Sequence, residues 1–225
     1  INSIFYHFFI CNITICIFNV IFYGNNGNII LTPDHVRKLI IHGVESDMVL
    51  QPIVPAECKI EFIGDSLTSG EGLTGTDNIS EWCTGIYGLT GHYALNIARY
   101  FDAEYSIVSQ SGWGVYTGWD NNMNSNMPRV YGEVCGPLDG QMNEELGAHR
   151  AWDFESWRPD LVIVNLGTND AAALNSPAWI DTETGINYKM QADEDGAPDT
   201  VSRDNFMSAV YDFLTDIRAA NPGAY

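Results

Sequence analysis

Residues 60–72 read Ile-Glu-Phe-Ile-Gly-Asp-Ser-Leu-Thr-Ser-Gly-Glu-Gly, and this stretch decides the fold that we expect. An apolar, strand-like run ends at Gly64, and small polar residues follow it at once. Open α/β sheets hold their ligands at the carboxyl ends of strands, which is where the hydroxyl of Ser66 would lie. An ordinary strand-to-loop turn is the alternative, because Gly, Asp and Ser are common turn residues.

Two later stretches repeat this pattern. Residues 106–116 read Ser-Ile-Val-Ser-Gln-Ser-Gly-Trp-Gly-Val-Tyr, and residues 160–170 read Asp-Leu-Val-Ile-Val-Asn-Leu-Gly-Thr-Asn-Asp. Each is an apolar, β-branched run that breaks into glycine and polar residues. Three strands are therefore expected to end in polar turns, which carry Ser66, Gly112 and Asn169 in that order.

These turns resemble the sequence blocks of the SGNH, or GDSL, hydrolases, a family named for Ser, Gly, Asn and His in four blocks. Residues 64–67 (Gly-Asp-Ser-Leu) resemble the first block, Gly112 the second, and residues 167–170 (Gly-Thr-Asn-Asp) the third. The resemblance covers the chain from residue 58 to its end. It implies an α/β fold, with a flavodoxin-like parallel sheet between two layers of helices.

The same resemblance implies a site for carboxylic ester hydrolysis. Ser66 would be the nucleophile, and the oxyanion hole would comprise the backbone N–H groups of Ser66 and Gly112 with the side-chain amide of Asn169. The family needs neither a metal nor a cofactor for this reaction. Asp65 and Asp170 are expected to support the turns by accepting hydrogen bonds from backbone N–H groups, as short acidic side chains commonly do.

Within the family, residues 60–66 and 111–116 look most like carbohydrate esterase family 2, whose members remove acetyl groups from plant polysaccharides. Trp113, Trp119 and Trp82 fall on or near the expected active-edge loops. Aromatic faces are large contact surfaces that can stack on sugar rings, although packing in the core is the alternative for each. The expected substrate is an acetylated carbohydrate.

The fourth block, which would carry the catalytic histidine, is absent. The five histidines are His7, His35, His42, His92 and His149, and none of them follows the third block. We therefore expect the base to lie outside this chain and the hydrolase domain to be incomplete at its carboxyl end. His149 is expected to lie away from the catalytic edge, and His92 to be packed or exposed on a helix.

Two other functions stay open. A lipase or thioesterase of the same family would need an apolar substrate groove, whereas the loops here are rich in Asn, Gly, Asp and Trp. A carbohydrate-binding protein without turnover would explain the absence of a base.

The composition and net charge of the chain limit the classes of molecule that it is expected to bind. The chain has 225 residues, of which 45% are hydrophobic and 17% charged, as in globular proteins. The net charge of −19 disfavours nucleic acids and anionic lipid surfaces as partners but is compatible with a neutral polysaccharide. The five cysteines show no Cys-x-x-Cys spacing, which argues against a zinc site. The oligomeric state is left open, and a secreted or cell-associated location is favoured over the cytoplasm.

The N-terminal region differs from the rest. Residues 1–23 are rich in Ile, Phe and Asn, and they contain no charged residue. Three interpretations stay open for them: a segment foreign to the folded protein, strands of an accessory domain, or a membrane or signal segment, which the interrupting Asn residues argue against. Residues 24–57 are expected to be the remnant of an accessory β-sandwich and a linker, and residues 58–225 the hydrolase domain.

The coarse pattern of the hydrolase domain alternates strands and helices, which predicts a parallel sheet. Strands are expected over 58–63, 104–109 and 160–166, helices over 86–100 and 203–220, and an inserted surface loop over 175–202.

Overall fold

The computed structural model describes residues 55–75 and 84–225. Residues 1–23, most of the segment 24–57 and Trp82 lie outside this part of the chain, so the expectations for them, an N-terminal β domain included, stay predictions. Within the described ranges, no helix is both long and apolar enough to cross a membrane.

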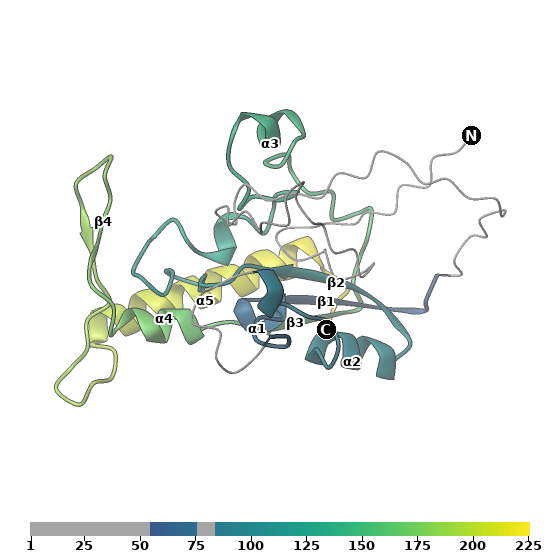
Figure 1. The fold of residues 1–225 in the computed structure, drawn as a ribbon, viewed down its shortest axis with the longest axis horizontal. Coiled ribbons are helices and arrows are strands. Elements are labelled where there is room, and N and C mark those ends of the chain that lie inside the picture. Colours follow the sequence, from purple (N-terminus) through teal and green to yellow (C-terminus); the bar gives the residue numbers. More distant parts are fainter. Residues whose placement is uncertain (1–54, 76–83) are drawn as a thin grey trace.

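A parallel sheet with the strand order β2-β1-β3 forms the centre of the fold (Figure 1). Its strands are β1 (Cys58–Gly64), β2 (Ala103–Ser109) and β3 (Leu161–Asn165). The register places Gly64 opposite Ser109 of β2 and opposite Asn165 of β3. The strands therefore end at one level, and the turns after them meet at one edge. The expected parallel α/β sheet is confirmed.

One face of the sheet is covered by α2 (Tyr93–Tyr100). Ile60 and Phe62 of β1 are fully buried and pack with Ala94 of this helix. Because successive strand residues point to opposite faces, Ile63 lies on the other side of the sheet and belongs to a separate cluster.

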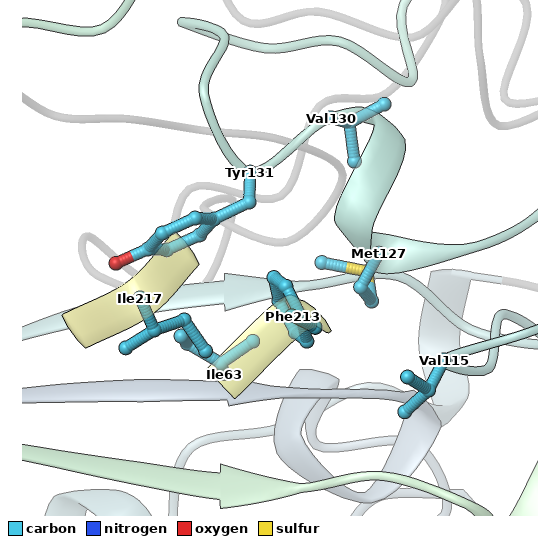
Figure 2. Close-up of a cluster of buried hydrophobic side chains, with 7 residues drawn as sticks. All are labelled: Ile63, Val115, Met127, Val130, Tyr131, Phe213 and Ile217. Atoms are coloured by element: carbon cyan, nitrogen blue, oxygen red, sulfur yellow. The ribbon is translucent and has the colours of Figure 1, made fainter. Parts of the chain in front are cut away.

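The other face is covered by α5 (Thr200–Ala220), which is 21 residues long and runs along the sheet (Figure 1). Its N-terminus is capped by Asp199, whose carboxylate accepts a 2.7 Å hydrogen bond from the backbone N–H of Ser202. Burying an apolar side chain stabilises a fold by roughly 1.5–3 kcal/mol. Seven buried side chains form the core on this face (Figure 2): Ile63, Val115, Met127, Val130, Tyr131, Phe213 and Ile217.

The remaining elements are short. They are α1 (Ser66–Ser69), α3 (Gln141–Glu145), α4 (Thr168–Ala173), the 3₁₀ turns η3 (Thr84–Ile86) and η4 (Met127–Arg129), and an antiparallel hairpin of β4 (Trp179–Ile180) and β5 (Asn187–Tyr188).

Two sequence expectations need correction. The helix expected over 86–100 begins only at Tyr93, because the chain before it passes through Gly91 with φ of +82°, a conformation that interrupts a right-handed helix. The segment 175–202, expected to be a loop, contains the β4–β5 hairpin and the first turn of α5. Strands of two residues carry too little periodicity to be predicted.

A buried polar network joins β1 to the end of α5. The hydroxyl of Tyr131 donates a 2.7 Å hydrogen bond to the carboxylate of Glu61, and the side-chain amide of Asn221 donates to the same hydroxyl at 2.8 Å. Burial raises the pKa of Glu61, and the hydrogen bond from Tyr131 opposes that shift. Tyr131 is thus both part of the apolar core and the shared partner of two buried polar side chains.

We expect Tyr131→Phe to lower the free energy of unfolding by about 1–3 kcal/mol, because it leaves Glu61 and Asn221 without their shared partner. Urea denaturation monitored by circular dichroism measures the change. The matched control is Tyr211→Phe on the exposed side of α5, which should stay within about 0.5 kcal/mol of the wild type. Equal stability of Tyr131→Phe and the wild type would contradict a structural role for the network.

Candidate active site

Ser66 lies at the end of β1, on the tight turn into α1. The turn has no room for a side chain at residue 64, where a Cβ would lie 1.9 Å from Oγ1 of Thr68 and 2.9 Å from the carbonyl oxygen of Asn165. Asp65 caps α1, since its Oδ1 accepts a 3.0 Å hydrogen bond from the backbone N–H of Leu67. The sequence Gly-Asp-Ser-Leu therefore fixes a partly exposed serine at the first position of a helix.

Gly112 lies on the turn after β2 with φ of +79°, a conformation that favours glycine. A Cβ at this position would also lie 2.9 Å from Cδ1 of Trp119. The backbone N–H of Trp119 donates to the carbonyl of Gly112 at 3.0 Å, which holds the indole against the glycine. Trp119 nevertheless remains 54% exposed, so an aromatic surface is available beside the second turn.

Asn169 lies in the first turn of α4, after β3. Its Nδ2 donates a 2.9 Å hydrogen bond to the carbonyl of Trp113 and lies 3.4 Å from Oδ2 of Asp65. The first contact is a good hydrogen bond and the second is long. One amide hydrogen thus positions the side chain, whereas the other makes only a long contact with Asp65 on the Ser66 turn.

Asp170 joins the third turn to the second. Its two carboxylate oxygens accept hydrogen bonds from the backbone N–H groups of Val115, Tyr116 and Thr117 at 2.9, 2.7 and 3.0 Å. A Cβ on Gly114 would lie 2.2 Å from Oδ2 of Asp170, so the approach requires glycine there. The carboxylate therefore sets the path of the chain directly after Gly112.

The carboxylate of Asp65 is sequestered in this arrangement. Burial raises its pKa, the N–H of Leu67 opposes the shift, and the negative charge of Asp170 adds to it. Asp65 is 1% exposed, and its carboxylate contacts the backbone N–H of Leu67 at the start of α1 and the side chain of Asn169.

Another contact at this edge was not predictable from sequence. The hydroxyl of Tyr87 donates to Oε2 of Glu71 at 3.0 Å and shares a 2.7 Å hydrogen bond with Oγ of Ser111. It joins the chain just after α1 to the residue before Gly112. Tyrosine carried no positional signal in the sequence that would have identified this role.

The three tryptophans differ in their surroundings. Trp113 packs against the core cluster below α5 and offers its carbonyl to Asn169, whereas Trp119 is largely exposed beside Gly112. Trp82 lies outside the described residues. Of the tryptophans that the structure describes at this edge, Trp119 is therefore the one whose ring faces solvent.

Neither of the two histidines in the described ranges is hydrogen-bonded to Ser66. His149 contacts Glu133 at 3.2 Å and the carbonyl of Leu138 at 2.9 Å. That carbonyl raises the pKa of His149 most, and Glu133 adds to the shift, although burial opposes it. His92 is only 1% exposed and lies beside the backbone of Leu67 and Thr68 in α1, although within the described chain neither of its ring nitrogens makes a hydrogen bond of good geometry.

No group of three or more His, Cys, Asp or Glu side chains is placed to hold a metal ion in the part of the chain that the structure describes. What the three turns offer is a serine hydroxyl, backbone N–H groups and one neutral amide at a common edge. This arrangement can stabilise negative charge on the oxygen of a carbonyl compound that the serine attacks.

The sequence matches the GDSL-like lipase/acylhydrolase family over residues 60–223, and the chain belongs to this family of SGNH hydrolases. The resemblance seen in the three turns is thereby confirmed. Within the family, its similarity is to acetyl xylan esterases and to carbohydrate esterases of family 2.

Among solved structures, the acetyl xylan esterase Est2A of the rumen bacterium Butyrivibrio proteoclasticus matches with a TM-score of 0.74 and 45% identity, over 77% of this chain. A family two carbohydrate esterase of Clostridium thermocellum, solved in complex with cellohexaose, matches with a TM-score of 0.56 and 26% identity, over 78% of this chain and 43% of that one. A curated relative, the acetylxylan esterase/glucomannan deacetylase of Cellvibrio japonicus, is 30% identical over 60% of this chain. The present chain spans 46% of the Est2A chain and 34% of the Cellvibrio protein.

We expect Asp170→Ala to lower the free energy of unfolding by about 3 kcal/mol or more, because three backbone N–H groups lose their charged acceptor. Thermal and urea denaturation measure the loss. The matched control is Asp216→Ala on the exposed side of α5, which should leave stability within about 0.5 kcal/mol of the wild type. A variant as stable as this control would show that water replaces the carboxylate and that the turn does not depend on it.

The burial of His92 predicts that the stability of the protein depends on pH. Burial lowers its pKa from the usual 6.5, so below that value the unfolded chain takes up a proton that the folded ring does not. The contribution of His92 to stability therefore falls as the pH falls below 6.5. We expect His92→Leu to gain more stability over the wild type at pH 5 than at pH 7.5, measured by urea denaturation. A difference between the two proteins that does not change with pH would mean that the folded ring accepts the proton freely.

Proposed function

We propose that the protein is a serine esterase that hydrolyses O-acetyl esters of a neutral polysaccharide such as xylan. The observation that carries this proposal is the pair of contacts made by Asn169, which reach the Ser66 turn through Asp65 and the Gly112 turn through Trp113. They support a common site for a nucleophile and oxyanion donors.

In the proposed reaction, Oγ of Ser66 attacks the acetyl carbonyl, and negative charge develops on the carbonyl oxygen. The backbone N–H groups of Ser66 and Gly112 and the amide of Asn169 would bind that oxygen. Losing one such donor typically costs roughly 3–4 kcal/mol of transition-state stabilisation. The bond from the acetyl carbon to the sugar oxygen then breaks, the sugar leaves as an alcohol, and water hydrolyses the acetyl-serine to acetate.

The serine must lose its proton to a base as it attacks. Because neither His92 nor His149 forms a hydrogen bond with Ser66 among the described residues, we propose that another residue supplies this base. The test compares the rate of the present chain with that of protein expressed from the complete coding sequence. Equal rates in the two would place the base within residues 1–225.

A polysaccharide is favoured over a lipid substrate by three observations. Trp119 presents an exposed aromatic ring beside Gly112, on which a sugar ring can stack. The net charge of −19 repels anionic lipid surfaces. The Est2A and Cellvibrio relatives are esterases of acetylated polysaccharides by name, and the Clostridium relative was solved with a glucan oligosaccharide.

We expect protein expressed from the complete coding sequence to release acetate from acetylated xylan, and Ser66→Ala to reduce that rate by on the order of 10⁴-fold or more, because the nucleophile is lost. Acetate release is measured by a coupled assay. Ser208→Ala on the exposed side of α5 is the matched control and should retain the wild-type rate.

The outcomes separate the competing functions. Retained turnover in Ser66→Ala would place the nucleophile elsewhere and overturn the assignment. A wild-type protein that binds xylan but releases no acetate would support the carbohydrate-binding alternative. Faster release of long-chain fatty acids than of acetate would support a lipase.

A further inference from the structure

A cavity of about 190 Å³ lies beside the turn that carries Gly112. One wall is formed by Tyr116 and Thr117, which follow that glycine. The opposite walls come from β5 of the hairpin and from the first turns of α5, which lie together at one end of the molecule (Figure 1). No residue assigned above to the nucleophile or the oxyanion donors lines this cavity, so it is a separate site at the same edge of the sheet.

The walls are held in place by Asn121, which is 1% exposed and has φ of +67°. Its Nδ2 donates hydrogen bonds to the carbonyls of Ala173 and Pro177, both at 2.9 Å, and its Oδ1 accepts one from the backbone N–H of Met190 at 2.8 Å. One side chain thus joins both ends of the hairpin to the loop after Gly112.

Two further contacts fix the opposite side of the cavity. Nζ of Lys189 donates to the carbonyls of Ala173 and Leu174 at the end of α4, and Oγ of Ser202 accepts from the backbone N–H of Gln191 at 2.8 Å. The Lys189 charge is therefore committed to capping a helix. A cavity whose walls are already ordered loses little conformational entropy when it binds a ligand.

The polar groups in the cavity are mostly neutral. Thr117 is 1% exposed, and its hydroxyl has no hydrogen-bond partner among residues 55–75 and 84–225. The phenol of Tyr116 lies near the side chains of Asn205 and Tyr188; burial raises its pKa, and Asn205 opposes the shift. Aromatic rings can pack against the face of a sugar ring, and hydroxyl and amide groups can hydrogen-bond its neutral hydroxyls. The cavity offers both kinds of group.

The charges around the cavity disfavour an anionic ligand. The carboxylate of Asp199 lines it and caps α5, while Lys189 is committed to α4. The net charge of the chain, −19, adds a long-range repulsion. A neutral pyranose therefore fits this site better than a uronic acid.

We propose that this cavity is a subsite that holds one unacetylated, neutral sugar residue of the polysaccharide whose acetyl ester is cleaved at Ser66. The choice of a polysaccharide as ligand rests on the proposed function. Asp170 connects the two sites, because it fixes Tyr116 and Thr117 from the residue next to Asn169. A chain bound in the subsite would thus be positioned by the same segment that follows Gly112.

The test measures binding of acetyl-free xylotetraose to the 225-residue chain by isothermal titration calorimetry, which requires no turnover. We expect Asn205→Ala and Tyr188→Ala each to weaken binding about fivefold to tenfold, the loss that one hydrogen bond or one ring contact produces. The matched control is Asn96→Ala, another exposed helical asparagine, on α2 across the sheet, which should bind as the wild type does. Melting temperatures of all variants show whether each remains folded.

Each outcome decides the proposal. Weaker binding in both cavity variants, with the control unchanged, supports the subsite. Wild-type binding in folded cavity variants, or no binding by the wild type at millimolar xylotetraose, overturns it. Tighter binding of a glucuronic-acid-substituted xylotetraose would overturn the neutral sugar as ligand. Acetate release that survives Ser66→Ala would overturn the proposed esterase mechanism while leaving these binding results intact.

Discussion

One carboxylate, that of Asp170, holds the candidate site together. It accepts hydrogen bonds from three consecutive backbone N–H groups of the segment that follows Gly112, although it lies on the turn after a different strand. The common register of the three strand ends brings the turns to one edge, but it does not fix how each turn is folded. Asp170 fixes the backbone of the second turn, and the absence of a side chain at Gly114 lets its carboxylate approach. The positions of Gly112, of Trp119 against it and of the cavity wall at Tyr116 all depend on this interaction.

The sheet and the turns that carry Ser66, Gly112 and Asn169 were predictable because short local sequence patterns determine them. Apolar runs followed by glycine indicate β1, β2 and β3. The glycine at position 112 is consistent with the positive φ that the backbone adopts there. The partners of Asp170 were not predictable, since they lie 53 to 55 residues away along the chain and no local pattern encodes such a separation. The sequence predicted that this aspartate accepts hydrogen bonds from turn N–H groups, but it could not say which turn would supply them.

The hairpin and Asn121 mark the limit of what sequence shows. β4 and β5 have two residues each, too few for an alternating pattern, so their segment resembled a surface loop. Asn121 stands among several polar residues that look alike in sequence, and its role follows only from its left-handed backbone and from its hydrogen bonds to segments 52 to 69 residues away along the chain. The expected base is a different case, because neither of the two described histidines is hydrogen-bonded to Ser66, and residues 1–54 lie outside the described part of the chain.

The way Asn121 holds the hairpin has a consequence for how this protein can change. Both ends of the hairpin segment, at Pro177 and at Met190, are bonded to the side chain of Asn121, and Lys189 adds a second attachment to the end of α4. Changes in length or sequence at its tip, around Gly185, leave that anchor and the turns of the sheet untouched. The tip can therefore change without displacing the hairpin residues that line the cavity or the turn that carries Ser66. Under the proposed function, the contacts to the polymer in the cavity and the residues of ester cleavage would therefore lie on separate segments of the chain.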